Sequence, residues 1–136
     1  MSAFTVAVVR YEEPERSVRR AVEMCRGLDP LPAWAKVFIK PNIVFWTRSV
    51  PFPKWGVVTT TRVVEDVVLL LKERGIDAVT IGEGTVTRTP GDTETAAHAF
   101  KTLGYEALTR RYGVKCLNVF ERPFAPGIPS SRTSPT

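Results

Sequence analysis

The stretch VFIKPNIVFWTRSVPFPKWGVVTTTRVVEDVV, residues 37–68, decides the fold. Its apolar start has the composition of a buried strand, which ends at Lys40-Pro41-Asn42. A long loop with several aromatic residues follows, and three threonines then open a run with helical periodicity. The stretch therefore predicts a strand, a long loop and a helix in that order, with a lysine, an asparagine and a threonine cluster near the two junctions.

The helix that begins at the threonines has the clearest pattern in the chain and covers residues 59–75. Its predicted apolar face consists of Val63, Val64, Val67, Val68, Leu70 and Leu71. Charged residues are expected outside that face, namely Arg62, Glu65, Asp66, Lys72 and Glu73. A threonine N-cap begins this helix, and a cationic last turn with Gly75 ends it.

The rest of the chain alternates strands and helices around this unit. Apolar runs predict four strands, at residues 5–10, 36–40, 77–84 and 115–121. Helical periodicity also covers residues 14–27 and residues 92–113, the latter interrupted at Gly104. Strands that are apolar throughout suit a parallel sheet covered on both faces. The β-α-β-α-β-α-β order therefore predicts a doubly wound, three-layer α/β fold, with a mostly parallel four-stranded sheet and helices on both faces.

The 136 residues are enough for one domain with a hydrophobic core. We expect this domain over residues 1–121 and a disordered tail, rich in proline, serine and threonine, over residues 122–136. The net charge of +5 permits binding of anions or nucleic acid, but the basic residues are scattered, which favours a solvated surface. Nucleic-acid binding is therefore disfavoured.

The composition also argues against several classes of protein. Cys25 and Cys116 are far apart and form no CxxC motif, and two cysteines alone cannot hold zinc or an iron–sulfur cluster. Buried free thiols suit a reducing cytoplasm. We find no signal peptide and no apolar run of transmembrane length, so we expect a cytoplasmic protein without membrane contact. We expect no metal and no cofactor.

Polar residues gather where two of the predicted strands end and where the helix between them begins. Nine residues form these clusters: Lys40, Asn42, Thr59, Thr60, Thr61, Gly82, Glu83, Gly84 and Thr85. In an open parallel sheet, ligands bind beyond the carboxyl ends of the strands, at a switch point of the strand order. A helix N-terminus favours an anion, and Lys40 adds a full positive charge. The clusters therefore predict a crevice that binds a small carboxylate or phosphate.

Each of these residues also has a structural interpretation. The threonines can act as helix caps, Asn42 as a turn residue, and Lys40 as the point where the strand meets water. Glu83 suits a metal ligand or a general base, although a solvated or helix-capping carboxylate is preferred. The run GEGTVT (82–87) matches only part of a dinucleotide-binding GxGxxG fingerprint, so dinucleotide binding is discounted. His98 is the only histidine and lies in a helical stretch, so we assign no catalytic residue.

The loop at residues 43–58 is unusually long for a compact domain. It carries Phe45, Trp46, Phe52 and Trp55. Loops of this length often form a lid or a binding surface, and exposed aromatic side chains suggest an interface. Packing of the loop on the body of the domain is the alternative. We prefer that packing or a protein contact over stacking on nucleic-acid bases.

Four stretches taken together resemble the domain of unknown function 362 family: VFIKPNIV (37–44), GVVTTTRVVEDVVLLLKERG (56–75), AVTIGEGT (78–85) and AFKTLGYEALTRRYGVKCLNV (99–119). The resemblance runs over about residues 5–120 and covers the N-terminal part of the family's domain. Lys40, Asn42, Thr60 or Thr61, and Glu83 match motif positions, with Glu83 where the family commonly has aspartate. The resemblance implies a fold similar to part of the nickel-pincer lactate racemase family and an activity that is largely undefined.

The chain also departs from the family pattern. Many members carry an attached iron–sulfur ferredoxin-like module, whose cysteines are absent here, and family domains continue past the last predicted strand. We therefore expect a short or truncated member whose exposed sheet edge invites pairing between chains. The alternative function is a non-catalytic interaction domain that forms a homo-oligomer through the loop at 43–58 and this open edge.

Overall fold

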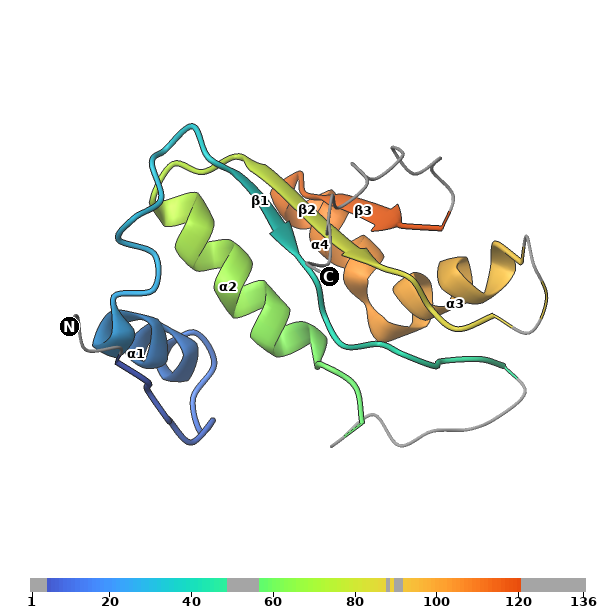
Figure 1. Cartoon of the computed structure of the whole chain (residues 1–136), viewed down its shortest axis with the longest axis horizontal. Helices are drawn as coiled ribbons and strands as arrows, with labels where there is room; N and C mark the ends of the chain where they lie inside the picture. Colours follow the sequence, from blue (N-terminus) through green and yellow to red (C-terminus); the bar gives the residue numbers. More distant parts are fainter. Residues whose placement is uncertain (1–4, 49–56, 88, 90–91, 121–136) are drawn as a thin grey trace, which may run out of the picture.

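A computed structural model describes residues 5–48, 57–87, 89 and 92–120 of the chain. This part of the chain forms one parallel sheet with strand order β1-β2-β3 and four helices (Figure 1). The strands are β1 (Lys36–Ile39), β2 (Ala78–Glu83) and β3 (Lys115–Asn118). The helices are α1 (Arg16–Cys25), α2 (Thr61–Glu73), α3 (Glu94–Leu103) and α4 (Tyr105–Tyr112). The predicted α/β class and parallel pairing are therefore confirmed.

The helices that connect the strands cover one face of the sheet. Helix α2 connects β1 to β2, and helices α3 and α4 connect β2 to β3. Because the strands follow one another in the same direction across the sheet, right-handed crossovers place these helices on the same side. Val37, Val79 and Ile81 point into the core on that side, whereas Phe38 on the other face is 51% exposed.

The structure corrects two parts of the predicted fold. Residues 5–10 were expected to form a fourth strand, but they lie outside the sheet beside α1, and Val6 and Val8 are 84% and 90% exposed. Without a strand before β1, the strand order never reverses, so no helix in the described part of the chain covers the second face. The described domain therefore has two layers, not the three layers expected with helices on both faces.

Helix α1 is held against α2 rather than against the sheet. The Arg19 guanidinium forms an ion pair with Glu73 at the end of α2 (2.6 Å). The Tyr11 hydroxyl donates a hydrogen bond to the carboxylate of Asp66 (2.9 Å). These contacts draw the amino-terminal segment to the outer side of α2. They also explain why Asp66 is buried, although its side chain was expected outside the apolar face.

The core lies between the covered face of the sheet and helices α2, α3 and α4. Helix α2 contributes the buried Val64, Val68 and Leu71 and the partly buried Val67, which are four of the six residues of its predicted apolar face. Gly104 adopts a φ of 92°, in the left-handed region that glycine tolerates, and it separates α3 from α4 as predicted. Tyr105, the first residue of α4, is fully buried and packs edge-on against Phe100.

The remaining predictions concern the long loop, the tail, the two cysteines and membrane spans. Residues 49–56 of the long loop and the predicted tail at 122–136 lie outside the described residues. Cys25 and Cys116 are free thiols, and both are half-buried. None of the described helices is long and apolar enough to cross a membrane.

On the uncovered face of the sheet, the packing of Phe38 requires that residue 82 has no side chain. The Phe38 ring lies over this glycine, and a Cβ added there would sit 2.4 Å from the Phe38 Cζ and 3.2 Å from the Leu117 carbonyl oxygen. No side chain fits at that position while the ring stays in place. The glycine therefore lets a half-exposed aromatic ring pack closely against the sheet backbone.

Replacing Gly82 with alanine is expected to displace the Phe38 ring. We expect Gly82→Ala to lower the free energy of unfolding by about 1–2 kcal/mol because of this overlap. In a Phe38→Ala background the same change should cost clearly less. Urea denaturation of the four variants measures both effects. An equal cost in the two backgrounds would show that Phe38 does not lie over the glycine.

Candidate functional site

The predicted clusters at the carboxyl ends of β1 and β2 are joined by an ion pair. The Lys40 ammonium lies 2.7 Å from one carboxylate oxygen of Glu83, and the other oxygen accepts a hydrogen bond from the backbone N–H of Gly84 (2.9 Å). The Glu83 side chain is only 7% exposed, whereas that of Lys40 is 63% exposed. The pair therefore presents an ammonium to solvent above a buried carboxylate.

Asn42 and Thr59 tie the end of β1 to the start of α2. The Asn42 backbone N–H donates to the Thr59 hydroxyl (2.9 Å), and the Thr59 N–H donates back to the Asn42 carbonyl oxygen (2.8 Å). The Asn42 side-chain amide also donates to the carbonyl oxygen of Val57 (3.2 Å). These bonds close the base of the long loop. The Asn42 side chain therefore bonds a residue 15 positions away rather than its own backbone, as a turn residue would.

The other two threonines have different roles. Thr60 occupies the N-cap position of α2 but makes no side-chain capping bond, so the predicted threonine cap is only positional. The Thr61 hydroxyl donates to the carbonyl oxygen of Leu103, the last residue of α3. Thr61 thus braces α2 against the end of α3, and its hydroxyl is already engaged.

Gly82 near the end of β2, and Gly84 and Thr85 just after it, face protein, not an open crevice. Gly82 lies under the Phe38 ring, and a Cβ at Gly84 would meet the Phe120 ring at 2.7 Å. Thr85 is fully buried, and its hydroxyl has no hydrogen-bond partner among the described residues. These residues therefore allow close packing at the sheet edge, and the switch point expected there is absent because the strand order does not reverse.

Two residues that the sequence prediction omitted belong to the same edge. Asn118 ends β3, is paired in register with Glu83 and is buried. Its side-chain oxygen accepts the backbone N–H of Phe120 (3.1 Å). Tyr105 reaches the edge from α4, and its hydroxyl donates to the carbonyl oxygen of Thr59 (2.8 Å). The last strand was predicted to run to residue 121, three residues past its observed end, so the strand-end rule did not mark Asn118, and Tyr105 has no comparable signal.

Burial dominates the electrostatics behind the ion pair. Removal from solvent raises the pKa of Tyr105 well above its ordinary value, and the nearby Cys116 and Glu83 charges act in the same direction. Burial also raises the pKa of the Cys116 thiol, while a hydrogen bond with Thr109 partly lowers it. Both groups are therefore protonated at neutral pH. In the described residues, no three His, Cys, Asp or Glu side chains gather as a metal site would require.

The described half of the long loop packs on α3. The Trp46 indole N–H donates to the Thr102 hydroxyl (2.8 Å), and the Arg48 side chain donates to a ring nitrogen of His98 (3.3 Å). Trp46 also packs against the hydrophobic core. These contacts support the packing alternative for residues 43–48. The contact that His98 makes with Arg48 helps to hold the loop on α3 and indicates a structural role. Phe52 and Trp55 lie outside the described residues.

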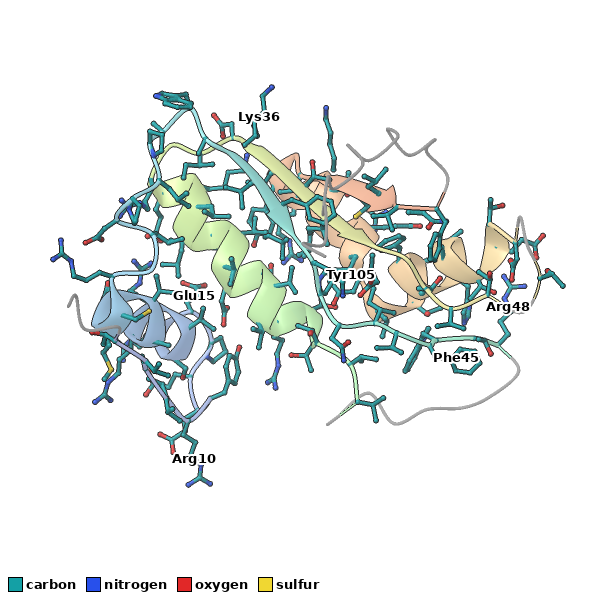
Figure 2. The ribbon with its side chains drawn as sticks, in the orientation of Figure 1. Arg10, Glu15, Lys36, Phe45, Arg48 and Tyr105 are labelled. Carbon is teal, nitrogen blue, oxygen red and sulfur yellow. The ribbon has the colours of Figure 1, made fainter. Side chains whose placement is uncertain are left out.

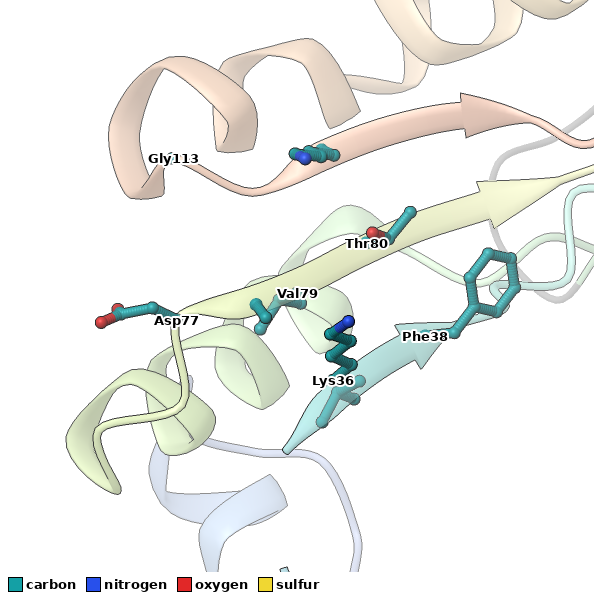
Figure 3. A pocket seen from close by; sticks show the side chains of 9 residues that line it. Lys36, Phe38, Asp77, Val79, Thr80 and Gly113 are labelled. Carbon is teal, nitrogen blue, oxygen red and sulfur yellow. The ribbon is translucent and has the colours of Figure 1, made fainter. Parts of the chain in front are cut away.

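An open hollow of about 430 Å³ lies on the uncovered face of the sheet, toward the amino ends of the strands (Figure 3). Its polar lining comes from Lys36, Asp77, Thr80 and Lys115. Every charged residue among them is exposed, and Asp77 is paired with Lys72 (3.0 Å). The hollow is thus far from the predicted crevice and contains no buried charged group that would fix a ligand.

Comparison with known proteins gives one match. Residues 37–134 match the family model described as Domain of unknown function (DUF362). The matched range includes all nine residues of the predicted site and most of the predicted tail. No curated protein and no solved structure is significantly similar to the chain.

The Lys40–Glu83 pair should be coupled in stability. We expect Lys40→Met to lower the free energy of unfolding by about 1–2 kcal/mol, because it removes a partner from a buried carboxylate. In a Glu83→Gln background the same change should cost less, since the amide needs no counter-charge. Lys36→Met, at an exposed lysine that begins β1, is the control and should cost less than about 0.5 kcal/mol. Equal losses for both lysines in urea denaturation would contradict the coupling.

Tyr105 should make the domain sensitive to alkaline pH. Its pKa is raised in the folded state, so its contribution to stability is complete below the ordinary tyrosine pKa of about 10 and is lost as the pH rises above it. Tyr105→Phe should cost about 1 kcal/mol at pH 7 through the lost hydrogen bond. Above pH 10 the free energy of unfolding should fall less steeply with pH in Tyr105→Phe than in the wild type. The two slopes should differ by up to about 1.4 kcal/mol per pH unit.

Urea denaturation at a series of pH values measures this dependence. Tyr112→Phe is the comparison, because that phenol is half-buried and hydrogen-bonded to Glu65. The same pH slope in wild type and in Tyr105→Phe would mean that the Tyr105 phenol ionises freely in the folded protein.

Proposed function

The chain belongs to the DUF362 family, and we propose that its α/β domain binds a small anion, a carboxylate or a phosphate, at the carboxyl ends of β1 and β2. The observation that carries this proposal is the Lys40–Glu83 pair. Its ammonium is held at 2.7 Å from a buried carboxylate, yet the lysine side chain is 63% exposed. A positioned but solvent-facing ammonium is suited to a ligand that arrives from solution.

The Lys40 ammonium keeps hydrogen-bonding capacity beyond the ion pair. An ammonium has three N–H donors, and the bond to Glu83 uses one of them. An anion at the other donors would make a charge-assisted hydrogen bond, which is shorter and stronger than a neutral one. The bond to Glu83 restrains the side chain beforehand, so less side-chain entropy is lost when the anion binds.

The start of α2 adds a second favourable group. The Asn42–Thr59 bonds bring the residues after β1 to the amino end of this helix, which carries a partial positive charge. The Thr60 side chain makes no capping bond there. A small anion between Lys40 and this helix end would therefore meet the Lys40 ammonium, whose charge Glu83 offsets, and one partial positive charge.

Glu83 limits which anions fit. Its carboxylate neutralises the Lys40 charge, so an approaching dianion would meet a site with little net positive charge. A monoanionic carboxylate is therefore preferred over a phosphate dianion. No reaction is proposed for this site, because the nearby Tyr105 and Cys116 are protonated and engaged in hydrogen bonds.

Self-association is a second candidate function, and a specific observation favours it. Both outer strands of the sheet, β1 and β3, pair only with β2 among the described residues. Exposed edges of this kind present unpaired backbone groups that pair readily with another chain. The described part of the long loop packs on α3, so the sheet edge, rather than that loop, would be the contact surface.

Anion binding is tested by thermal unfolding with and without ligand. At ten times its dissociation constant a small carboxylate should stabilise the wild-type protein by about 1.4 kcal/mol, which corresponds to roughly 3–6 °C. Lys40→Ala should abolish this shift relative to its own ligand-free melting temperature. Phosphate at pH 8, where the dianion dominates, should give a smaller shift than the carboxylate.

Lys36→Ala is the matched control, because this lysine is also exposed but lies at the amino end of β1, whereas Lys40 follows its carboxyl end. It should respond to the carboxylate as the wild type does. A ligand shift that is retained in Lys40→Ala, or no shift with any carboxylate or phosphate, would refute the proposed site.

A further inference from the structure

We propose that residues 5–10 of one copy of this chain pair as an added β-strand with the outer edge of β1 in a second copy. The inference rests on the self-association described above and identifies the segment that would cover the open edge. It joins two features that the single chain leaves unmatched: a strand-like segment outside the sheet and a strand without a second neighbour.

The donor segment has the composition of a strand but none of its pairing. Its sequence, TVAVVR, consists mainly of β-branched and small apolar residues, which favour strands. In the described structure it makes no backbone hydrogen bond with another residue. Val6 and Val8 alternate along the segment and are 84% and 90% exposed. Two neighbouring valines with this exposure form an apolar surface that lacks a partner.

The acceptor is the free edge of β1. This strand pairs in parallel with β2 through Lys36 to Ile39, and no other described strand lies on its far side. Its outward backbone groups therefore lack sheet partners in the described chain. Phe38, in the middle of β1, is 51% exposed on the uncovered face. A strand added at this edge could cover the ring with the valine side chains of its own exposed side.

The geometry of a single copy opposes pairing within the chain. Tyr11, which follows the donor segment directly, donates a hydrogen bond to Asp66 in the middle of α2. The Arg62 guanidinium also lies over the Tyr11 ring, with its Cζ 5.1 Å from the ring centroid. Arg10 at the end of the segment lies on the opposite side of α1 and α2 from Lys36 at the start of β1 (Figure 2). Pairing within one copy would require α1 to leave α2, whereas pairing with a second copy keeps these contacts.

The first test is the mass of the full-length protein in solution. Size-exclusion chromatography with light scattering should show a dimer that dissociates on dilution. Val6→Lys/Val8→Lys should weaken the dimer at least about tenfold, because two apolar side chains at the contact become charged. The fold should survive, since both valines are exposed in the single chain. Val86→Lys, which changes a valine that is 53% exposed beyond the carboxyl end of β2, is the matched control and should remain dimeric.

The second test identifies the acceptor strand. A synthetic peptide with the sequence of residues 3–12 is added to the isotope-labelled Val6→Lys/Val8→Lys variant, which keeps an intact β1 edge. Amide signals of Lys36–Ile39 should shift and gain protection from hydrogen exchange. A peptide with both valines replaced by lysine should have no effect. Shifts confined to other parts of the protein would overturn the assignment of β1 as the acceptor.

The outcomes separate this inference from the broader function. A dimer that persists in Val6→Lys/Val8→Lys would overturn strand addition by residues 5–10, while self-association by another surface would stand. A monomer at all concentrations up to about 100 μM, well above the micromolar range of specific association, would overturn both. A monomer whose β1 amides are protected through its own residues 5–10 would also overturn the inference.

Discussion

The three parallel strands lie side by side in the order of the sequence, and the rest of the structure depends on this constraint. With β2 between β1 and β3 and both connections crossing on the same side, every connecting helix is used to cover one face. That arrangement buries Val79 and Ile81 of the central strand and builds the core. It also leaves the opposite face with a half-exposed Phe38 and an open hollow. The covered side and the uncovered side are thus two results of one connectivity.

At the carboxyl edge of the sheet, polar residues mostly satisfy one another. Asn42 and Thr59 exchange backbone and side-chain bonds, and Tyr105 reaches across from α4 to the same loop base. The Lys40–Glu83 pair differs, because one partner is buried and the other is largely exposed. In Lys40, a region of ordinary structural hydrogen bonds therefore contains a charged group that faces outward while its partner is buried, and this asymmetry is the basis of the proposed anion site.

Local patterns predicted the elements of this fold better than their assembly. The apolar periodicity of α2 and the break at Gly104 were readable, because both depend on neighbouring residues. The placement of residues 5–10 could not be predicted in this way. A β-branched run shows a preference for strands, but it does not show that Tyr11 forms a hydrogen bond with Asp66, which holds the segment away from the sheet. The strand-end rule located Lys40 and Glu83 correctly. It could not show that they pair with each other, that the glycines accommodate the aromatic rings of Phe38 and Phe120, or that Tyr105 joins the edge.

The attachment of α1 has a consequence for how this protein opens. Ser17 is the only residue of this helix that is classed as buried. The helix is linked to α2 by the half-exposed Arg19–Glu73 ion pair, and Tyr11, which precedes the helix, donates a hydrogen bond to Asp66 of α2. Segments with few buried apolar contacts open with a small free energy, independently of the global unfolding of the core. We therefore expect α1 to open more readily than the sheet and the three helices that cover it.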